Sequence, residues 1–160
     1  MLNLGIDSKL RGCDLVALKV RDISHVEQIA PRAIVQQRKT GRSVQFEITP
    51  VARQAVKEWI RQAELKSDDY LFPSRLHGSA HICTRRYARM LCDWVKDAGL
   101  EWTEYGTHSI RRTKATLIYR RTKNLRAGQL LLRHSKIEST LRYLGIDVDD
   151  ALQISEQTEI

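Results

Sequence analysis

Four side chains that can do chemistry follow one another in the last third of the sequence: His108, Arg111, His134 and Tyr143. A tyrosine hydroxyl is a nucleophile once its proton is removed, although a pKa of about 10 leaves it weak at neutral pH. The basic groups could hold a phosphodiester against that oxygen. Two more basic candidates, Arg11 and Lys39, lie far upstream. The fold would therefore have to assemble any site that all six share.

His108 and Arg111 are three residues apart, which places them one above the other on one face of a helix. We expect that helix to run from a cap at Thr107 to about Arg121. The free N–H groups and the positive dipole end of its first turn favour an anion there. The alternative is a histidine and an arginine on a solvated surface.

His134 and Tyr143 are nine residues apart, which on one continuous helix is roughly 900° and puts them on opposite sides. They can share a site only if the chain bends between them. Ser135 is a candidate N-cap for a new helix after such a bend. Tyr143 would then lie in the last turn of a short helix that ends at Gly145. The alternative for Tyr143 is an amphipathic residue at the edge of the core.

Lys39 and Arg11 would be placed by a hairpin and by an amphipathic helix. The β-prone runs 33–38 and 43–48 are separated by Lys39-Thr40-Gly41-Arg42, where glycine suits a turn with positive φ. Most hairpin lysines only stay solvated. Arg11 is followed three residues later by Asp14, and the alternative there is a surface ion pair worth less than about 1 kcal/mol.

The bulk composition is that of a single globular domain with a basic surface. The 160 residues are 42% hydrophobic and 29% charged, with a net charge of +8. Such a charge favours a polyanionic partner. The three cysteines show no CxxC spacing, and Cys13 and Cys92 lie in amphipathic segments, which predicts buried, reduced thiols in a cytosolic protein. No apolar run approaches 18 residues, which excludes a membrane span.

The remaining pattern predicts an α+β fold that is mainly helical. One small antiparallel sheet of about three strands is expected near the N-terminus, because Val20–Ser24 also has the composition of a strand. Thr49-Pro50 marks the start of a helix, with proline in the first turn. The other expected helices are 10–19, 82–98 with Gly99 after its end, 125–132, 137–144 and a tail after Val148.

Together the motifs resemble the tyrosine recombinases, or phage-type integrases. Leu10-Arg11-Gly12-Cys13-Asp14-Leu15 is similar to their first arginine box, and Lys39-Thr40 is similar to their hairpin lysine. His108-Ser109-Ile110-Arg111 resembles their H-x-x-R box. Leu132-Arg133-His134-Ser135 and Thr140-Leu141-Arg142-Tyr143 resemble the closing histidine and tyrosine boxes. The resemblance covers nearly the whole chain, from Arg11 to about Tyr143.

The resemblance implies a catalytic domain over residues 1–160 that recombines DNA at specific sites. Tyr143 would attack the scissile phosphate to give a 3′-phosphotyrosine, without metal, cofactor or ATP. Arg11 and Arg111 would bind the phosphate oxygens, and Lys39 would protonate the leaving 5′-oxygen. His108 would handle the proton of the tyrosine, and His134 would donate to the phosphate. The expected partner is double-stranded DNA, on which the chain would form a tetramer with full-length recombinase subunits. The isolated chain is expected to be a monomer, and no membrane partner is expected.

Two departures from the family pattern bear on this expectation. Arg133 stands where the family usually has glycine before the histidine, and we expect the N-terminal DNA-clamping (core-binding) domain of the family to be absent. The rival hypothesis is a basic, non-catalytic DNA-binding protein derived from an integrase. A zinc site at His77, His81 and Cys83 is a weaker interpretation, because Gly78 and Ser79 favour a loop and no second ligand pair follows.

Overall fold

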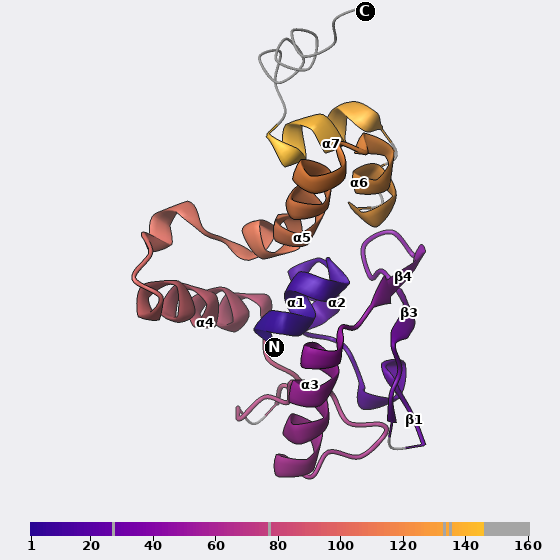
Figure 1. Ribbon diagram of the computed structural model, residues 1–160. Coiled ribbons are helices and arrows are strands. Elements are labelled where there is room, and N and C mark those ends of the chain that lie inside the picture. The colour runs from indigo at the N-terminus through magenta and orange to yellow at the C-terminus, as the bar shows by residue number, and fades with distance from the viewer. Residues whose placement is uncertain (27, 77, 133, 135, 146–160) are drawn as a thin grey trace, which may run out of the picture. The chain divides into compact units, whose positions relative to one another are not determined.

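The computed structural model describes residues 1–26, 28–76, 78–132, 134 and 136–145. The chain divides into two compact units, Met1–Arg111 and Arg112–Ile160, and the boundary falls inside a helix. The helices are α1 (Leu2–Ser8), α2 (Gly12–Leu15), α3 (Pro50–Gln62), α4 (Thr84–Asp97), α5 (Thr107–Thr122), α6 (Leu125–Leu132) and α7 (Ile137–Leu144), with 3₁₀ turns η1 (Val20–Asp22) and η2 (Trp102–Glu104). The strands are β1 (Ser24–His25), β2 (Gln28–Ile29), β3 (Arg32–Gln36) and β4 (Ser43–Glu47) (Figure 1).

The mainly helical α+β class is confirmed, but the arrangement of its strands differs from the prediction. Within the described residues the strands form two antiparallel pairs, β1–β2 and β3–β4, rather than one sheet of about three strands. Val20–Ser24 is not a strand, because residues 20–22 form the turn η1 and only Ser24 enters β1. The β3–β4 hairpin is the predicted one, with Val35 opposite Val44 and Gly41 at φ 64° in the turn.

The predicted helix 10–19 is wrong, and its failure matters for the site. Only Gly12–Leu15 is helical, and α1 precedes it. Lys9 stands between the two helices with φ 54°, and Arg11 is extended with ψ 150°. The apolar residues whose spacing matches one helix belong instead to α2 and to the turns on either side of it, and they are buried there. Leu10, Leu15 and Val16 are all at most 3% exposed.

The longer helices begin and end where the sequence predicts, within two residues. Thr49 caps α3 by accepting a hydrogen bond from the Ala52 N–H, with Pro50 in the first turn. Gly99, at φ 71°, lies two residues beyond α4. Helices α6 and α7 have the predicted bounds. The predicted helical tail after Val148 lies outside the described residues.

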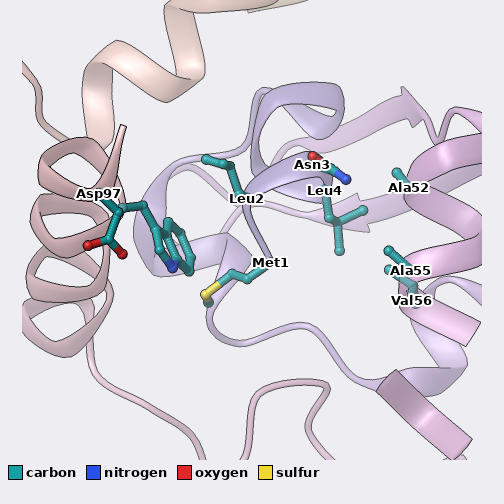
Figure 2. Close-up of a pocket in the computed structure, with 9 residues that line it drawn as sticks. Met1, Leu2, Asn3, Leu4, Ala52, Ala55, Val56 and Asp97 are labelled. Carbon is teal, nitrogen blue, oxygen red and sulfur yellow. The ribbon is translucent and has the colours of Figure 1, made fainter. Parts of the chain in front are cut away.

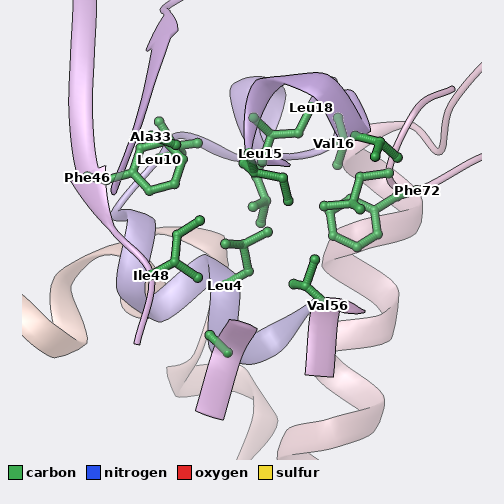
Figure 3. Close-up of a cluster of buried hydrophobic side chains, with 14 of the residues drawn as sticks. Leu4, Leu10, Leu15, Val16, Leu18, Ala33, Phe46, Ile48, Val56 and Phe72 are labelled. Carbon is green, nitrogen blue, oxygen red and sulfur yellow. The ribbon is translucent and has the colours of Figure 1, made fainter. Parts of the chain in front are cut away.

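The hydrophobic core of the first unit lies where α1, α2, α3 and the β3–β4 hairpin meet. Leu4 and Leu15 contribute from the two short helices, Phe46 from β4 and Val56 from α3 (Figure 3). Burying an aliphatic or phenyl side chain of this kind stabilises the fold by about 1.5–3 kcal/mol. Helix α1 contacts α3 and β4, and α2 contacts α4. The core therefore fixes the short segment that carries Arg11.

The second unit contains the close pair α6–α7. A Cβ placed on Gly128 of α6 would stand 3.2 Å from Leu144 Cδ1 and 3.6 Å from Thr140 Cγ2, so the helices approach closely at that glycine. Leu132 and Thr140 are both fully buried. Gly145 ends α7 in the left-handed conformation, with φ 69° and its N–H bonded to the Leu141 carbonyl. No helix among the described residues of either unit is long and apolar enough to cross a bilayer.

Candidate functional site: a cluster of basic residues around α2

Arg11 occupies the N-cap position of α2, and its side chain is only half-buried as a whole. Its Nη1 atom is fully buried, and no group in the described part of the chain accepts a hydrogen bond from it. A buried donor without an acceptor costs about 1–3 kcal/mol, so we expect a water, an ion or a ligand to accept from it. The alternative of a surface ion pair with Asp14 is wrong, because no such contact forms among the described residues and Asp14 is buried.

Asp14 connects α2 to the hairpin that carries Lys39. Its carboxylate is 3% exposed, and Oδ1 accepts the Arg38 backbone N–H at 2.9 Å. The Cys13 thiol lies 3.8 Å from the same oxygen. Arg38 directly precedes Lys39, so this hydrogen bond fixes the start of the turn against α2. This role was not predicted from the sequence, although a carboxylate within the amphipathic segment 10–18 was the feature that could have revealed it.

The turn between β3 and β4 closes on Gln37, which is 4% exposed. Its N–H donates to the Arg42 carbonyl at 2.9 Å, and its side-chain oxygen accepts the Thr40 hydroxyl at 2.8 Å. Lys39 lies at the exposed tip of this turn, as predicted. These hydrogen bonds fix the backbone of the turn, so that Lys39 is held in place while its side chain stays exposed to solvent.

The start of α5 lies against the same segment. The Cβ position of Gly12 is 3.9 Å from Thr107 Cβ, and that of Gly5 is 3.3 Å from Ile110 Cγ2. Thr107 is the first helical residue rather than the predicted cap, and Ser109 instead accepts the Gly106 N–H through its hydroxyl at 3.1 Å. His108 is exposed, and Arg111 is 4% exposed. The first unit thus gathers Arg11, Lys39 and the H-x-x-R turn around α2.

The buried tyrosine of α4 supports this packing. Tyr87 is 2% exposed and lies 3.5 Å from the Cβ position of Gly12, through its Cδ1 atom. Its hydroxyl lies 3.0 Å from the Cβ position of Gly5. Burial raises the pKa of Tyr87 to about 12, so the ring stays neutral at physiological pH. A Cβ at Gly5 would press on the Tyr87 hydroxyl, whereas a Cβ at Gly12 would meet the ring at ordinary van der Waals distance.

His134 and Tyr143 belong to the second unit, on either side of the predicted bend. His134 follows the end of α6, and its Nδ1 lies 3.1 Å from the hydroxyl of the fully buried Thr140. Tyr143 lies in the last turn of α7, as predicted, and its side chain falls outside the described part. The N-cap of α7 is Lys136, whereas the predicted cap Ser135 and the unusual Arg133 lie outside the described residues.

An apolar hollow in the first unit does not contain these groups. It measures about 330 Å³ and lies between α1, α3 and α4, where Leu2, Val56 and Trp94 are among its lining residues (Figure 2). The candidate residues around α2 occupy a surface instead, which suits a large ligand. No group of three or more metal-binding side chains occurs within the described ranges, and His77 lies outside them. Cys13 and Cys92 are half-buried, so the prediction that both are buried is wrong.

The sequence of the chain is similar to a known protein family and to named recombinases. Residues 1–149 match the model of the Phage integrase family. The chain belongs to this family. It is 32% identical over 145 residues to the probable integrase/recombinase YoeC of Bacillus subtilis strain 168, covering 91% of this chain and 75% of YoeC. It is 33% identical over 152 residues to the tyrosine recombinase XerC of Erythrobacter litoralis, covering 92% of this chain and 45% of XerC.

A solved structure shows the same fold. The XerH site-specific recombinase bound to a palindromic difH substrate, in a post-cleavage complex, matches with a TM-score of 0.77 at 19% identity. The match covers 96% of this chain and 43% of XerH. The chain therefore spans about half the length of XerC and XerH, and about three quarters of YoeC.

Proposed function

We propose that this chain is the catalytic domain of a site-specific tyrosine recombinase, over residues 1–160. The observation that carries the proposal is the gathering of Arg11, Lys39 and the H-x-x-R turn around α2, with the buried Arg11 Nη1 lacking an acceptor in the described residues. A phosphodiester supplies the acceptor oxygens that such a cluster needs. Family membership and the likeness of the fold to a recombinase crystallised on its DNA substrate support this assignment.

The proposed reaction is a transesterification that keeps the energy of the phosphodiester. The Tyr143 Oη–phosphorus bond forms and the phosphorus–O5′ bond breaks, which leaves a 3′-phosphotyrosine and a free 5′-hydroxyl. His108 takes the phenolic proton, and Lys39 gives a proton to the leaving O5′. Arg11 and Arg111 bind the non-bridging oxygens and stabilise the charge that grows in the transition state. Attack by another 5′-hydroxyl reverses these steps and rejoins the strand.

His134 has the chemistry of a phosphate donor. When the Thr140 hydroxyl donates to Nδ1, the neutral ring carries its proton on Nε2, and this is the N–H that would donate to a non-bridging oxygen. The surface of α6 and α7 beside it is cationic, with a hollow whose described lining includes Arg126, Lys136 and Arg142 and one carboxylate, Glu138. These cations would contact the DNA backbone on either side of the scissile phosphate.

The proposed partner is double-stranded DNA, and the active assembly is a tetramer with full-length recombinase subunits. The net charge of +8 favours the approach to DNA, and this attraction weakens as salt concentration rises. Without DNA we propose a cytosolic monomer. XerH is a relative whose structure was solved on such a substrate, difH.

The test of the proposed activity is covalent capture. Wild-type protein is incubated with a nicked suicide duplex in EDTA, and the covalent protein–DNA adduct is resolved on a denaturing gel. We expect Tyr143→Phe to abolish the adduct and the exposed Tyr105→Phe to retain it. Equal, background levels of adduct for wild type and Tyr143→Phe on a cognate site would favour the rival hypothesis, a non-catalytic DNA-binding protein.

The role of Lys39 has a separate test, which depends on the leaving group. Lys39→Ala should slow cleavage of an ordinary 5′-oxygen substrate by about 10²–10⁴-fold, the usual contribution of a general acid. The same variant should cleave a 5′-thiolate substrate at nearly the wild-type rate, because a thiolate leaves without protonation. The exposed Lys57→Ala on α3 is the control. Equal losses on both substrates would remove Lys39 from this role.

A further inference from the structure

Lys9, which directly follows α1, has a backbone conformation and a buried environment that lysine rarely occupies. Lys9 has φ 54°, in the left-handed region that favours glycine. It is also 3% exposed, although lysine is almost never fully buried without a partner. Only Leu10 separates it from Arg11. A glycine would satisfy this backbone more easily, so the side chain itself needs an explanation.

The Lys9 ammonium joins two segments that are distant in sequence. Nζ donates to the Asp7 carbonyl at 2.5 Å, and to Glu47 Oε1 at 2.8 Å. The Lys9 side chain is 2% exposed and that of Glu47 is 37% exposed. Asp7 in turn accepts the Thr49 N–H at 2.9 Å and the Thr49 hydroxyl at 2.6 Å. The turn before Arg11 is thereby tied to the end of β4 and to the start of α3.

A buried ion pair is a weak source of stability, because desolvation offsets most of the attraction between the charges. It does impose a geometry, since a buried ammonium must stay with its acceptors. Glu47 lies on the strand that returns from the Lys39 turn, and Asp14 holds the other side of that turn through the Arg38 N–H. Two polar tethers therefore connect the Arg11 segment to the hairpin.

We propose that Lys9 and Glu47 form a positioning pair that sets the backbone of Arg11 for phosphate binding. The pair touches neither substrate nor reacting atoms and acts through the α1–α2 turn. This inference rests on the proposed recombinase function. Its consequence is that loss of the pair slows the cleavage step itself, rather than DNA binding or folding.

The decisive variants are Lys9→Gly and a matched glycine substitution elsewhere. Glu64, which follows α3 closely, is exposed and has φ 51°. Both Lys9→Gly and Glu64→Gly relieve a left-handed backbone, so both should keep the melting temperature of the wild type. Only Lys9→Gly removes the tether. Glu47→Gln, at a side chain that reaches solvent, is a second way to remove the charge pair without altering the backbone of the turn.

The measurement is the single-turnover rate of cleavage of the suicide duplex at saturating DNA, together with the Kd for that duplex. We expect Lys9→Gly and Glu47→Gln to slow cleavage by about 10- to 100-fold, because a displacement of about 1 Å in a group that holds the substrate can have an effect of this size. The ratio between 5′-thiolate and 5′-oxygen substrates should stay at its wild-type value, because Arg11 acts on both. Kd should change by less than about twofold, since few phosphate contacts are altered.

Cleavage by Lys9→Gly at the rate of Glu64→Gly would overturn the proposal, and so would a loss confined to the 5′-oxygen substrate. If the wild type forms no adduct that depends on Tyr143, the proposed function fails, and hydrogen exchange then decides on the tether. Faster amide exchange in residues 10–15 of Lys9→Gly, but not of Glu64→Gly, supports the positioning pair. Equal exchange in the two variants rejects it.

Discussion

The segment around α2 and the pair α6–α7 hold their candidate residues in different ways. Around α2, buried polar side chains bind the backbone of distant segments, as Asp14 does with Arg38 and Asp7 does with Thr49. These bonds rest on the main hydrophobic core. In α6–α7, the His134 ring contacts a local partner, the hydroxyl of Thr140 six residues later.

This difference corresponds to two tasks in phosphoryl transfer. Groups that stabilise developing charge work best when they are fixed before the reaction, because no energy is then needed to reorient them. A nucleophile has to approach and leave the phosphorus as bonds form and break. Tyr143 lies in the last turn of an eight-residue helix that ends at a left-handed glycine. We therefore expect substitutions around α2 to lower the cleavage rate more than substitutions that loosen α6–α7.

Among Arg11, Asp14 and Thr140, which test this comparison, Arg11 should give the largest effect on the cleavage rate. Arg11→Ala removes a planar donor from the transition-state oxygens, and about 10²–10³-fold in cleavage rate is expected from the loss of one such donor. Arg11→Lys should recover only part of this, because an ammonium cannot form the paired bonds of a guanidinium. Single-turnover cleavage of the suicide duplex measures both variants.

The control for Arg11 is Arg61→Ala, which removes an exposed arginine paired with Glu58 on α3. It should cleave at the wild-type rate. Full activity of Arg11→Lys would mean that position 11 needs only a positive charge, and the contrast between a fixed and a mobile region would lose its main support.

Asp14 should give the next effect, and it should affect both folding and catalysis. Asp14→Ala leaves the Arg38 N–H without its acceptor, which should lower the free energy of unfolding by about 1–3 kcal/mol. The cleavage rate should fall by about 10- to 100-fold because the Lys39 turn loses its anchor. Denaturant unfolding and single-turnover cleavage are the two measurements.

Asp14→Asn is the matched variant, because its amide oxygen can still accept the Arg38 N–H. We expect it to recover most of the stability and most of the rate. If Asn and Ala were equally slow, the negative charge of Asp14 rather than its hydrogen bond to the hairpin would be what the site requires.

Local sequence patterns predicted most of the fold. The Thr49-Pro50 start of α3, the Gly41 turn and the bounds of α6 and α7 all follow from capping and turn chemistry that involves near neighbours. The helix predicted over 10–19 failed because Arg11 is extended and because the Leu18 carbonyl accepts a hydrogen bond from the distant Leu71 N–H instead of continuing a helix. A period of apolar residues cannot reveal a break that contacts with a distant segment stabilise.

The sequence identified the candidate chemistry better than it identified the residues that support it. The order of the six candidate residues was visible in the motifs, and the structure gathers four of them, Arg11, Lys39, His108 and Arg111, in the first unit. A surface ion pair between Asp14 and Arg11 was the alternative that the sequence left open, because an aspartate three residues after an arginine has the spacing of a helical pair. Its burial and its bond to Arg38 depend on the hairpin packing against α2, which local spacing cannot show.

Thr140 should give the smallest effect of the series, and it tests the second region directly. Thr140→Val keeps the buried shape and removes the hydroxyl that contacts His134 Nδ1, which should lower the free energy of unfolding by about 1 kcal/mol. The rate should fall by about threefold to tenfold, because His134 keeps its backbone bond to the Gln129 carbonyl but loses the contact that sets its ring. Thr140→Ser retains the hydroxyl and should stay near the wild-type rate. A Thr140→Val loss as large as that of Asp14→Ala would mean that α6–α7 is as strictly preorganised as the α2 region, because a local contact would then matter as much as a tether between distant segments.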